Sequence, residues 1–170
     1  MLRFMMDNFM CSWRNLLSGR VWTSVTNLFS HKDLGHLFFN CFTFYFLGRN
    51  VLDMIGSRRF IGLWFACGLV GNAASMLTHA YYKKDIHTHG SSGAINGIMA
   101  VLACAAPTSK FLIWGIVPVP AWLVVSGLFG YDMYKTVNNK GTGGVDTAGH
   151  IGGTVMGVAY YFALRYRVFR

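Results

Sequence analysis

The chain has 170 residues, of which 54% are hydrophobic and only 12% are charged, and its mean hydropathy is +0.39. A soluble domain carries about a quarter charged residues, so this composition indicates a single-domain, polytopic membrane protein. In a soluble protein the net charge of +9 would suggest a nucleic-acid ligand. No basic run or aromatic recognition motif accompanies that charge, and we exclude the class.

The cysteines and the N-terminal segment exclude two further classes. The four cysteines are dispersed and form no CxxC pair, so the sequence predicts neither a zinc knuckle nor a disulfide framework. The N-terminal segment contains Arg3, Arg14 and Arg20 with one acid, Asp7, but no long apolar core. It is therefore not a secretory signal, and it is only weakly similar to an organellar targeting segment.

Apolar segments recur from residue 34 onward and predict an all-α membrane bundle with about five transmembrane helices. Residues 1–33 contain no window of the roughly 20 apolar residues that a span needs, so we expect an interfacial region of loops and short helices. Residues 34–166 form the predicted transmembrane domain, and residues 167–170 a basic C-terminal tail. The expected spans are 34–52, 60–80, 93–106, 111–134 and 147–166.

Two of these segments depart from a simple span. The third is short and follows a polar loop, so its helix could begin below the membrane surface, where protein or a wet cavity must surround the loop. In the fourth segment, Pro118 and Pro120 should kink the helix or move its start. Residues 135–146 then form a Gly/Asn loop, which we expect to be flexible.

Basic residues favour one side of the membrane. Five spans place the loops alternately on two sides, and we call the side of the N-terminal region and of the 81–90 and 135–146 loops the first side. By its basic residues near the span ends, the second side is the better candidate for the cytosol or matrix. Against one acid, Asp53, it holds Arg49, Arg58, Arg59, Lys110, Arg165, Arg167 and Arg170.

Segment counting brings polar residues from three spans to one face of the bundle. His36 and Asn40 lie near the first-side end of the first span, Ser92 at that end of the third, and His150 at that end of the fifth. Ionisable residues in membrane helices usually face a neighbouring helix or a wet cavity. We therefore expect these side chains to lie at a similar depth in a common site.

The chemistry of these residues indicates nucleophilic catalysis. A serine hydroxyl is a poor nucleophile until a base takes its proton, and neutral imidazole does so near neutral pH. Ser92 begins a helix, where free backbone N–H groups suit an oxyanion. His36 and Asn40, one helical turn apart, could donate hydrogen bonds to the same charge.

Glycines at intervals of four residues predict how Ser92 meets His150. Such spacing gives a flat strip on a helix, which lets another backbone approach closely. We expect the strip on the third segment to pack against the strip on the fifth, bringing the hydroxyl within hydrogen-bond reach of the imidazole. The strips are Gly93 and Gly97, and Gly149, Gly153 and Gly157.

Three short motifs in this order resemble the rhomboid intramembrane serine proteases. They are His36-Leu-Phe-Phe-Asn40, Gly90-Ser-Ser-Gly93 and Gly149-His150-Ile-Gly-Gly153. Each alone is a weak signal, whereas all three in family order, each on the expected segment, are specific. The similarity extends from about Trp22 to Tyr166.

The resemblance implies a Ser92–His150 catalytic dyad without a third acid, and an oxyanion hole formed by His36, Asn40 and the backbone amide of Ser92. It also implies an amphipathic region before the first span, lying in the outer leaflet, and a mobile cap over the active site at residues 135–146. We also predict supporting or packing roles for Gly90, Gly93, Asn96, Gly149, Gly153 and Gly157.

The sequence departs from the family pattern at two points. The family core has six spans, and the one that precedes the Trp22 region is absent here, so a partner subunit could supply it or the chain could be processed or incomplete. Family members often place an aromatic residue four positions after the nucleophile, stacked on the histidine, where this chain has Asn96. Both departures favour the alternative function, a catalytically inactive rhomboid-like scaffold subunit of a larger membrane complex.

Each of these residues also has a plain structural interpretation. In isolation, Ser92 would most often be an N-cap and Asn40 a bridge between helices. We interpret Asp132 as a helix-end or surface residue and not as a member of a triad. His87 and His89 lack clear further ligands, so the sequence predicts no zinc site.

The motifs and their placement predict an intramembrane serine endopeptidase that cleaves transmembrane segments of membrane proteins, with no cofactor and no metal. The expected partners are transmembrane protein substrates and the lipid bilayer, with no nucleic acid. The expected location is the mitochondrial inner membrane, with the bacterial plasma membrane as the alternative. A transporter or channel is less favoured because the polar residues gather at one face.

Overall fold

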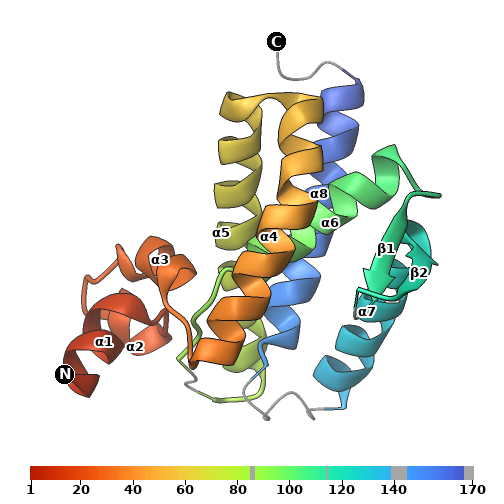
Figure 1. Ribbon diagram of the computed structural model, residues 1–170. Helices are drawn as coiled ribbons and strands as arrows, with labels where there is room; N and C mark the ends of the chain where they lie inside the picture. Colours follow the sequence, from red (N-terminus) through yellow and green to blue (C-terminus); the bar gives the residue numbers. More distant parts are fainter. Residues whose placement is uncertain (85–86, 114, 139–144, 167–170) are drawn as a thin grey trace.

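The computed structural model describes residues 1–84, 87–113, 115–138 and 145–166. Within these ranges the chain is a helical bundle with a small sheet at one edge (Figure 1). The bundle consists of α4 (Leu34–Ile55), α5 (Ser57–Tyr81), α6 (Ser92–Ala105), α7 (Ala121–Val137) and α8 (Thr147–Arg165). The predicted helical bundle is confirmed. The predicted tail at 167–170 and residues 139–144 of the predicted cap lie outside the described residues.

The helix lengths fit a membrane bundle. Among the described helices, α5 alone is both long and apolar enough to cross a membrane by length and composition, and α6 is a shorter apolar helix of 14 residues. At 1.5 Å per residue, α4 (22 residues) and α8 (19 residues) are about 33 and 28 Å long. These lengths are close to the roughly 30 Å of a bilayer's hydrocarbon core.

The expected helix at 111–134 begins ten residues later than predicted. Lys110–Ile113 (β1) and Val117–Pro120 (β2) form an antiparallel hairpin, and α7 starts directly after it. Proline has no backbone N–H and clashes with the preceding helical turn, so Pro118 and Pro120 are excluded from a helix interior. The predicted shift of the helix start is confirmed, while the hairpin itself was missed by the all-α prediction.

The first turns of α4 and α8 are fixed by carboxylate caps. Asp33 accepts a hydrogen bond from the backbone N–H of His36 at 2.8 Å, and Asp146 accepts one from the backbone N–H of Gly149 at 3.0 Å. An N-cap carboxylate satisfies an otherwise unpaired N–H and interacts favourably with the helix dipole. His36 and His150 therefore both stand in a capped first turn.

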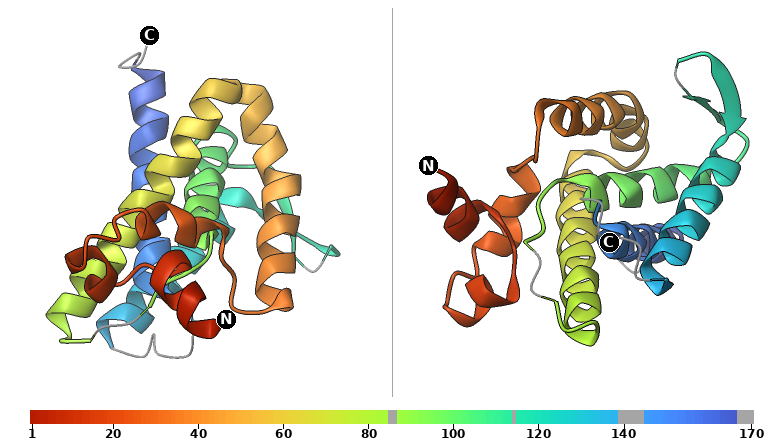
Figure 2. Two further views of the ribbon diagram at one scale, coloured as in Figure 1. Left: turned by 90° about the vertical axis from the view of Figure 1, so that its left-hand side faces the viewer. Right: turned by 90° about the horizontal axis from the view of Figure 1, so that it is seen from below.

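The centre of the bundle is a close contact of α8 with α5 and α6 (Figure 2). A Cβ atom on Gly153 would overlap the backbone oxygen of Gly93, and one on Gly157 would overlap the backbone of Gly97. On the α5 side, a Cβ on Gly71 would lie 2.8 Å from the backbone oxygen of Gly149. The predicted contact between the two glycine strips is present, and α5 adds a third small surface to it.

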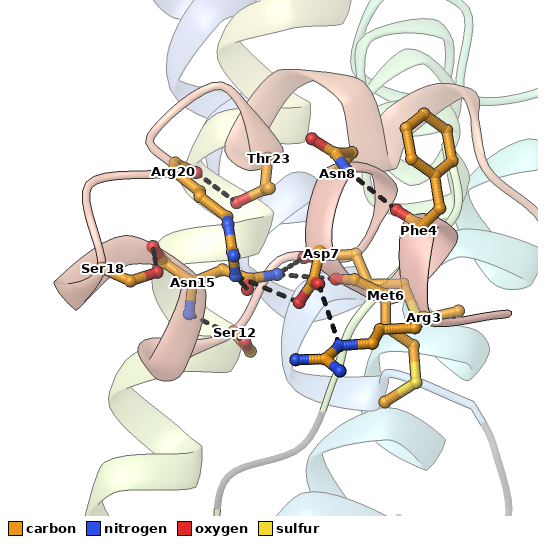
Figure 3. A network of polar contacts seen from close by, with 11 residues as sticks. Arg3, Phe4, Met6, Asp7, Asn8, Ser12, Asn15, Ser18, Arg20 and Thr23 are labelled. Carbon is orange, nitrogen blue, oxygen red and sulfur yellow. Dashed lines mark hydrogen bonds and ion pairs between the residues drawn. The ribbon is translucent and has the colours of Figure 1, made fainter. Parts of the chain in front are cut away.

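The N-terminal residues form short helices packed beside α5, namely α1 (Leu2–Phe9), α2 (Trp13–Leu17), α3 (Thr23–Thr26) and η1 (Asn27–Phe29). The Trp13 indole donates to the backbone oxygen of Met76 at 2.9 Å, and the Asn27 and Asn72 amides exchange two hydrogen bonds. Inside the region, Arg20 pairs with Asp7 at 3.1 Å (Figure 3). These contacts hold the segment against the bundle near the start of α4.

The glycine contact predicts a stability difference between two identical substitutions. Gly153→Ala places a methyl group on a backbone oxygen that cannot move aside, so we expect a loss of about 1–3 kcal/mol, the usual result of overpacking. Gly127→Ala is the control, because a Cβ there meets nothing within 4 Å and alanine is the better helix former. Thermal unfolding in detergent micelles, followed by tryptophan fluorescence, measures both. Equal midpoints would contradict the packing described here.

Candidate active site

Ser92 is the first residue of α6, and its side chain faces α8. Its Oγ lies 2.9 Å from Nε2 of His150, a hydrogen-bond distance. Ser91 occupies the N-cap position and makes no side-chain cap bond, so the interpretation of Ser92 as an ordinary N-cap is wrong. The first backbone N–H groups of a helix have no partner within it, so Ser92 has both a hydroxyl and a backbone donor that is unpaired within its helix.

His150 contacts a second helix through its other ring nitrogen. Its Nδ1 lies 3.1 Å from Oδ2 of Asp132 on α7, and the two side chains are only 16% and 8% exposed. The interpretation of Asp132 as a surface or helix-end residue is therefore wrong. The resemblance implied no third acid, yet the structure lines up a hydroxyl, an imidazole and a carboxylate from α6, α8 and α7.

Sequence reasoning missed Asp132 although one signal was available. It is the only charged residue in the first four turns of α7, AWLVVSGLFGYDMY. An ionisable residue in an apolar membrane helix is by default a functional candidate. Which face of α7 it occupies could not be known before the position of α8 was known.

Asn96 hydrogen-bonds within its own helix. Its side-chain amide donates to the backbone oxygen of Ser92 at 2.9 Å, one turn back along α6. This position therefore has an amide tied to the α6 backbone, where the family pattern has a ring stacked on the histidine.

His36 approaches the loop that leads into Ser92. Gly90 has φ +115°, and a Cβ on it would lie only 2.8 Å from Cε1 and 3.0 Å from Nε2 of His36. A glycine is required here both by the backbone conformation and by the ring. The Nδ1 atom of His36 is 3.4 Å from the backbone N–H of Lys32, an arrangement that favours hydrogen on Nε2, the atom beside Gly90.

Asn40 is buried one turn further along α4. Its side-chain amide donates to the backbone oxygen of His36 at 2.9 Å. A primary amide has two N–H donors, so this bond uses only one of them. The two predicted oxyanion donors thus stand on consecutive turns of α4.

Two further histidines lie in the loops around this site. The rings of His31 and His89 stand 5.2 and 6.1 Å from the ring of His36. Burial lowers the pKa of His31, as does the nearby charge of His89, and burial likewise lowers the pKa of His89. Within the described ranges, no group of three or more His, Cys, Asp or Glu side chains could hold a metal ion.

A small pocket reaches Ser92 from the side of α5 and η1. Its volume of about 10 Å³ is close to the space that one water molecule needs. His89 is one of the lining residues, and its buried Nδ1 has no hydrogen-bond partner among the described residues. It is lined by Asn27, Leu28, Gly68, Gly71, Asn72, Thr88, His89, Gly90, Ser92, Gly93, Asp146 and Gly149.

Three known proteins are similar to this chain over most of its length. RHOMBOID-like protein 12, mitochondrial, of Arabidopsis thaliana is 30% identical over 99% of this chain and 54% of its own. Rhomboid protein 1, mitochondrial, of Saccharomyces cerevisiae is 26% identical over 80% of this chain and 40% of its own. Rhomboid protease GluP of Bacillus subtilis is 28% identical over 84% and 26%. The chain thus spans about half, or less, of the length of these relatives.

The sequence model of the rhomboid domain matches residues 18–167. This range contains α3 to α8 and every residue of the site described above. The match covers far more than half of the chain, and it agrees with the three motifs and the helical membrane bundle. The chain belongs to the rhomboid family.

Proposed function

We propose that this protein is an intramembrane serine endopeptidase that cleaves transmembrane segments of membrane proteins. The observation that carries the proposal is the 2.9 Å contact between Oγ of Ser92 and Nε2 of His150. A hydroxyl paired with an imidazole inside a membrane bundle is the arrangement that nucleophilic catalysis needs. One relative of this chain, from Bacillus subtilis, is named a rhomboid protease.

The proposed reaction has two halves. As Oγ of Ser92 attacks the peptide carbonyl carbon, Nε2 of His150 takes the hydroxyl proton and then gives it to the leaving amine, so that the C–N bond breaks and an acyl-enzyme forms. In the second half, a water molecule gives a proton to His150 and its oxygen attacks the ester carbon. The ester C–O bond then breaks, the new carboxyl end of the substrate leaves, and the proton on His150 returns to Oγ of Ser92. No cofactor enters either half.

The oxyanion of each tetrahedral intermediate would rest on donors from two helices. The backbone N–H of Ser92 comes from the start of α6, and the side chains of His36 and Asn40 come from α4. Donors held in place before the reaction stabilise developing charge without reorganising, which is often the largest single contribution to catalysis. Burial of Asn40 keeps its amide fixed.

The depth of the site limits the substrate. Ser92 and His150 stand in the first turns of α6 and α8, so a substrate helix must unwind near the first side of the membrane to reach them. Small or helix-breaking residues in the substrate lower the cost of that unwinding. We therefore propose single-span membrane proteins as substrates. The relatives from Arabidopsis thaliana and Saccharomyces cerevisiae are named as mitochondrial, and the mitochondrial inner membrane is the proposed location.

A scaffold without proteolytic activity is the second candidate, and Asn96 is the observation that favours it. The family pattern places a ring on the histidine, whereas the Asn96 amide bonds to the Ser92 backbone, so one restraint on the imidazole is missing. Such a protein would bind transmembrane helices as a subunit of a larger complex without cutting them. A serine-reactive probe separates the two candidates.

We expect a fluorophosphonate probe to label the purified protein, and Ser92→Ala to abolish labelling. His150→Ala should also abolish it, because the hydroxyl then has no base. Ser91→Ala is the matched control, since this neighbour faces His31 at 3.5 Å and should leave labelling intact. In liposomes, the wild-type protein and Ser91→Ala should cleave a transmembrane substrate, whereas Ser92→Ala and His150→Ala should not. Unlabelled wild-type protein would point to the scaffold.

We expect Asn40→Ala to lower kcat by about 10²–10³, the usual effect of removing one oxyanion donor, with little change in KM. The control is Asn50→Ala on the same helix. Asn50 donates to the backbone oxygen four residues earlier, as Asn40 does, but it is exposed and lies toward the other end of α4. The proposed oxyanion role is wrong if both variants change kcat equally in the liposome assay.

A further inference from the structure

Asp132 is a buried carboxylate in an apolar helix, and its position needs a physical explanation. Its side chain is 8% exposed, and burying an ionised carboxylate is costly unless it is paired and hydrogen-bonded. The contact that the structure provides is Nδ1 of His150 at 3.1 Å. Because that imidazole is the proposed base, the carboxylate bears directly on the reaction.

We propose that Asp132 is a positioning residue that holds the His150 imidazole with its hydrogen on Nδ1 and its lone pair toward Ser92. This inference rests on the proposed function. An ionised carboxylate can only accept hydrogen bonds, so Nδ1 must donate. The neutral ring then has a free lone pair on Nε2, which lies 2.9 Å from the hydroxyl whose proton it takes. When the ring becomes charged during the reaction, the carboxylate also stabilises that charge.

A second contact one turn away keeps α7 in register with α8. Thr136 and Thr147 hydrogen-bond through their hydroxyls at 2.8 Å. Asp132 and Thr136 are four residues apart on one helix, and Thr147 and His150 are three apart on the other, so each pair shares a face. The phenol of Tyr82 donates to the last turn of α7, at the backbone oxygen of Thr136. The carboxylate is thus held at the imidazole by the packing of its own helix.

Asp132 can supply the restraint on His150 that the family pattern obtains from a ring at the position of Asn96. In the family pattern a ring packs against the face of the histidine, whereas the Asn96 amide here hydrogen-bonds to the Ser92 backbone. Asp132 instead restrains the edge of the imidazole that points away from Ser92. A hydrogen bond at Nδ1 fixes both the ring orientation and the position of the hydrogen, whereas a stacked ring fixes only the orientation.

The test compares Asp132→Asn with Asp53→Asn in the full chain, in the liposome cleavage assay. Both changes replace a carboxylate by an amide of the same size, but Asp53 is exposed in α4. We expect Asp132→Asn to lower kcat by about 10²–10⁴, as loss of an aligned base does, with KM unchanged. Asp53→Asn should leave both constants within about threefold. Asp132→Glu, which restores a carboxylate, should recover part of the lost kcat.

The outcomes separate this inference from the proposed function. If the wild-type protein cleaves and the kcat of Asp132→Asn is within about threefold of the wild-type value, the positioning role is wrong. The proposed protease function is then still supported. If wild-type protein neither cleaves nor reacts with the fluorophosphonate probe, the proposed function itself fails.

A spectroscopic measurement on the wild-type protein tests the same point without relying on the folding of the variants. In ¹⁵N-histidine NMR in micelles at neutral pH, the signals that His150→Ala removes should show a hydrogen on Nδ1 and none on Nε2. Hydrogen on Nε2 would overturn the proposal, because that tautomer presents a donor instead of a lone pair to Ser92.

Discussion

The approach of two helix backbones without side chains between them is the constraint on which the site depends. Gly93 on α6 and Gly153 on α8 are in contact through backbone atoms, at an interaxial distance that any Cβ would increase. In lipid, where apolar burial does not drive helices together, such close packing is a main source of association. Ser92 and His150 stand directly beside this contact, so the packing that holds the bundle also sets their separation.

The sequence could place the four residues of the predicted site at one end of the bundle because the depth of a residue in the membrane depends only on its position along its span. Once the spans are counted, the depth of a residue follows from its place in its segment, and His36, Asn40, Ser92 and His150 fall at one depth. The direction in which each side chain points is harder to predict from the sequence. For Ser92 and His150 the glycine strips indicated this direction, since a strip marks the helix face that meets a neighbouring helix.

The sequence did not predict the hairpin or the contact of Asp132, because in each case the local sequence pattern is compatible with two different structures. The segment from Phe111 to Val119 is as apolar as a membrane span. It is a hairpin because β1 pairs with β2, and the hairpin ends at Pro120. Asp132 lies in a helix without a glycine strip facing α8, so its rotation about the helix axis carried no sequence signal. Its role became visible only when α7 was placed against α8.

The pairing of Asp132 with His150 has a consequence for how the chain enters the membrane. An unpaired carboxylate in an apolar membrane helix is costly, and the partner of Asp132 lies 18 residues later in the chain. When α7 emerges during synthesis, α8 does not yet exist to pair with it. We therefore expect α7 and α8 to enter the membrane together, as one antiparallel pair of helices.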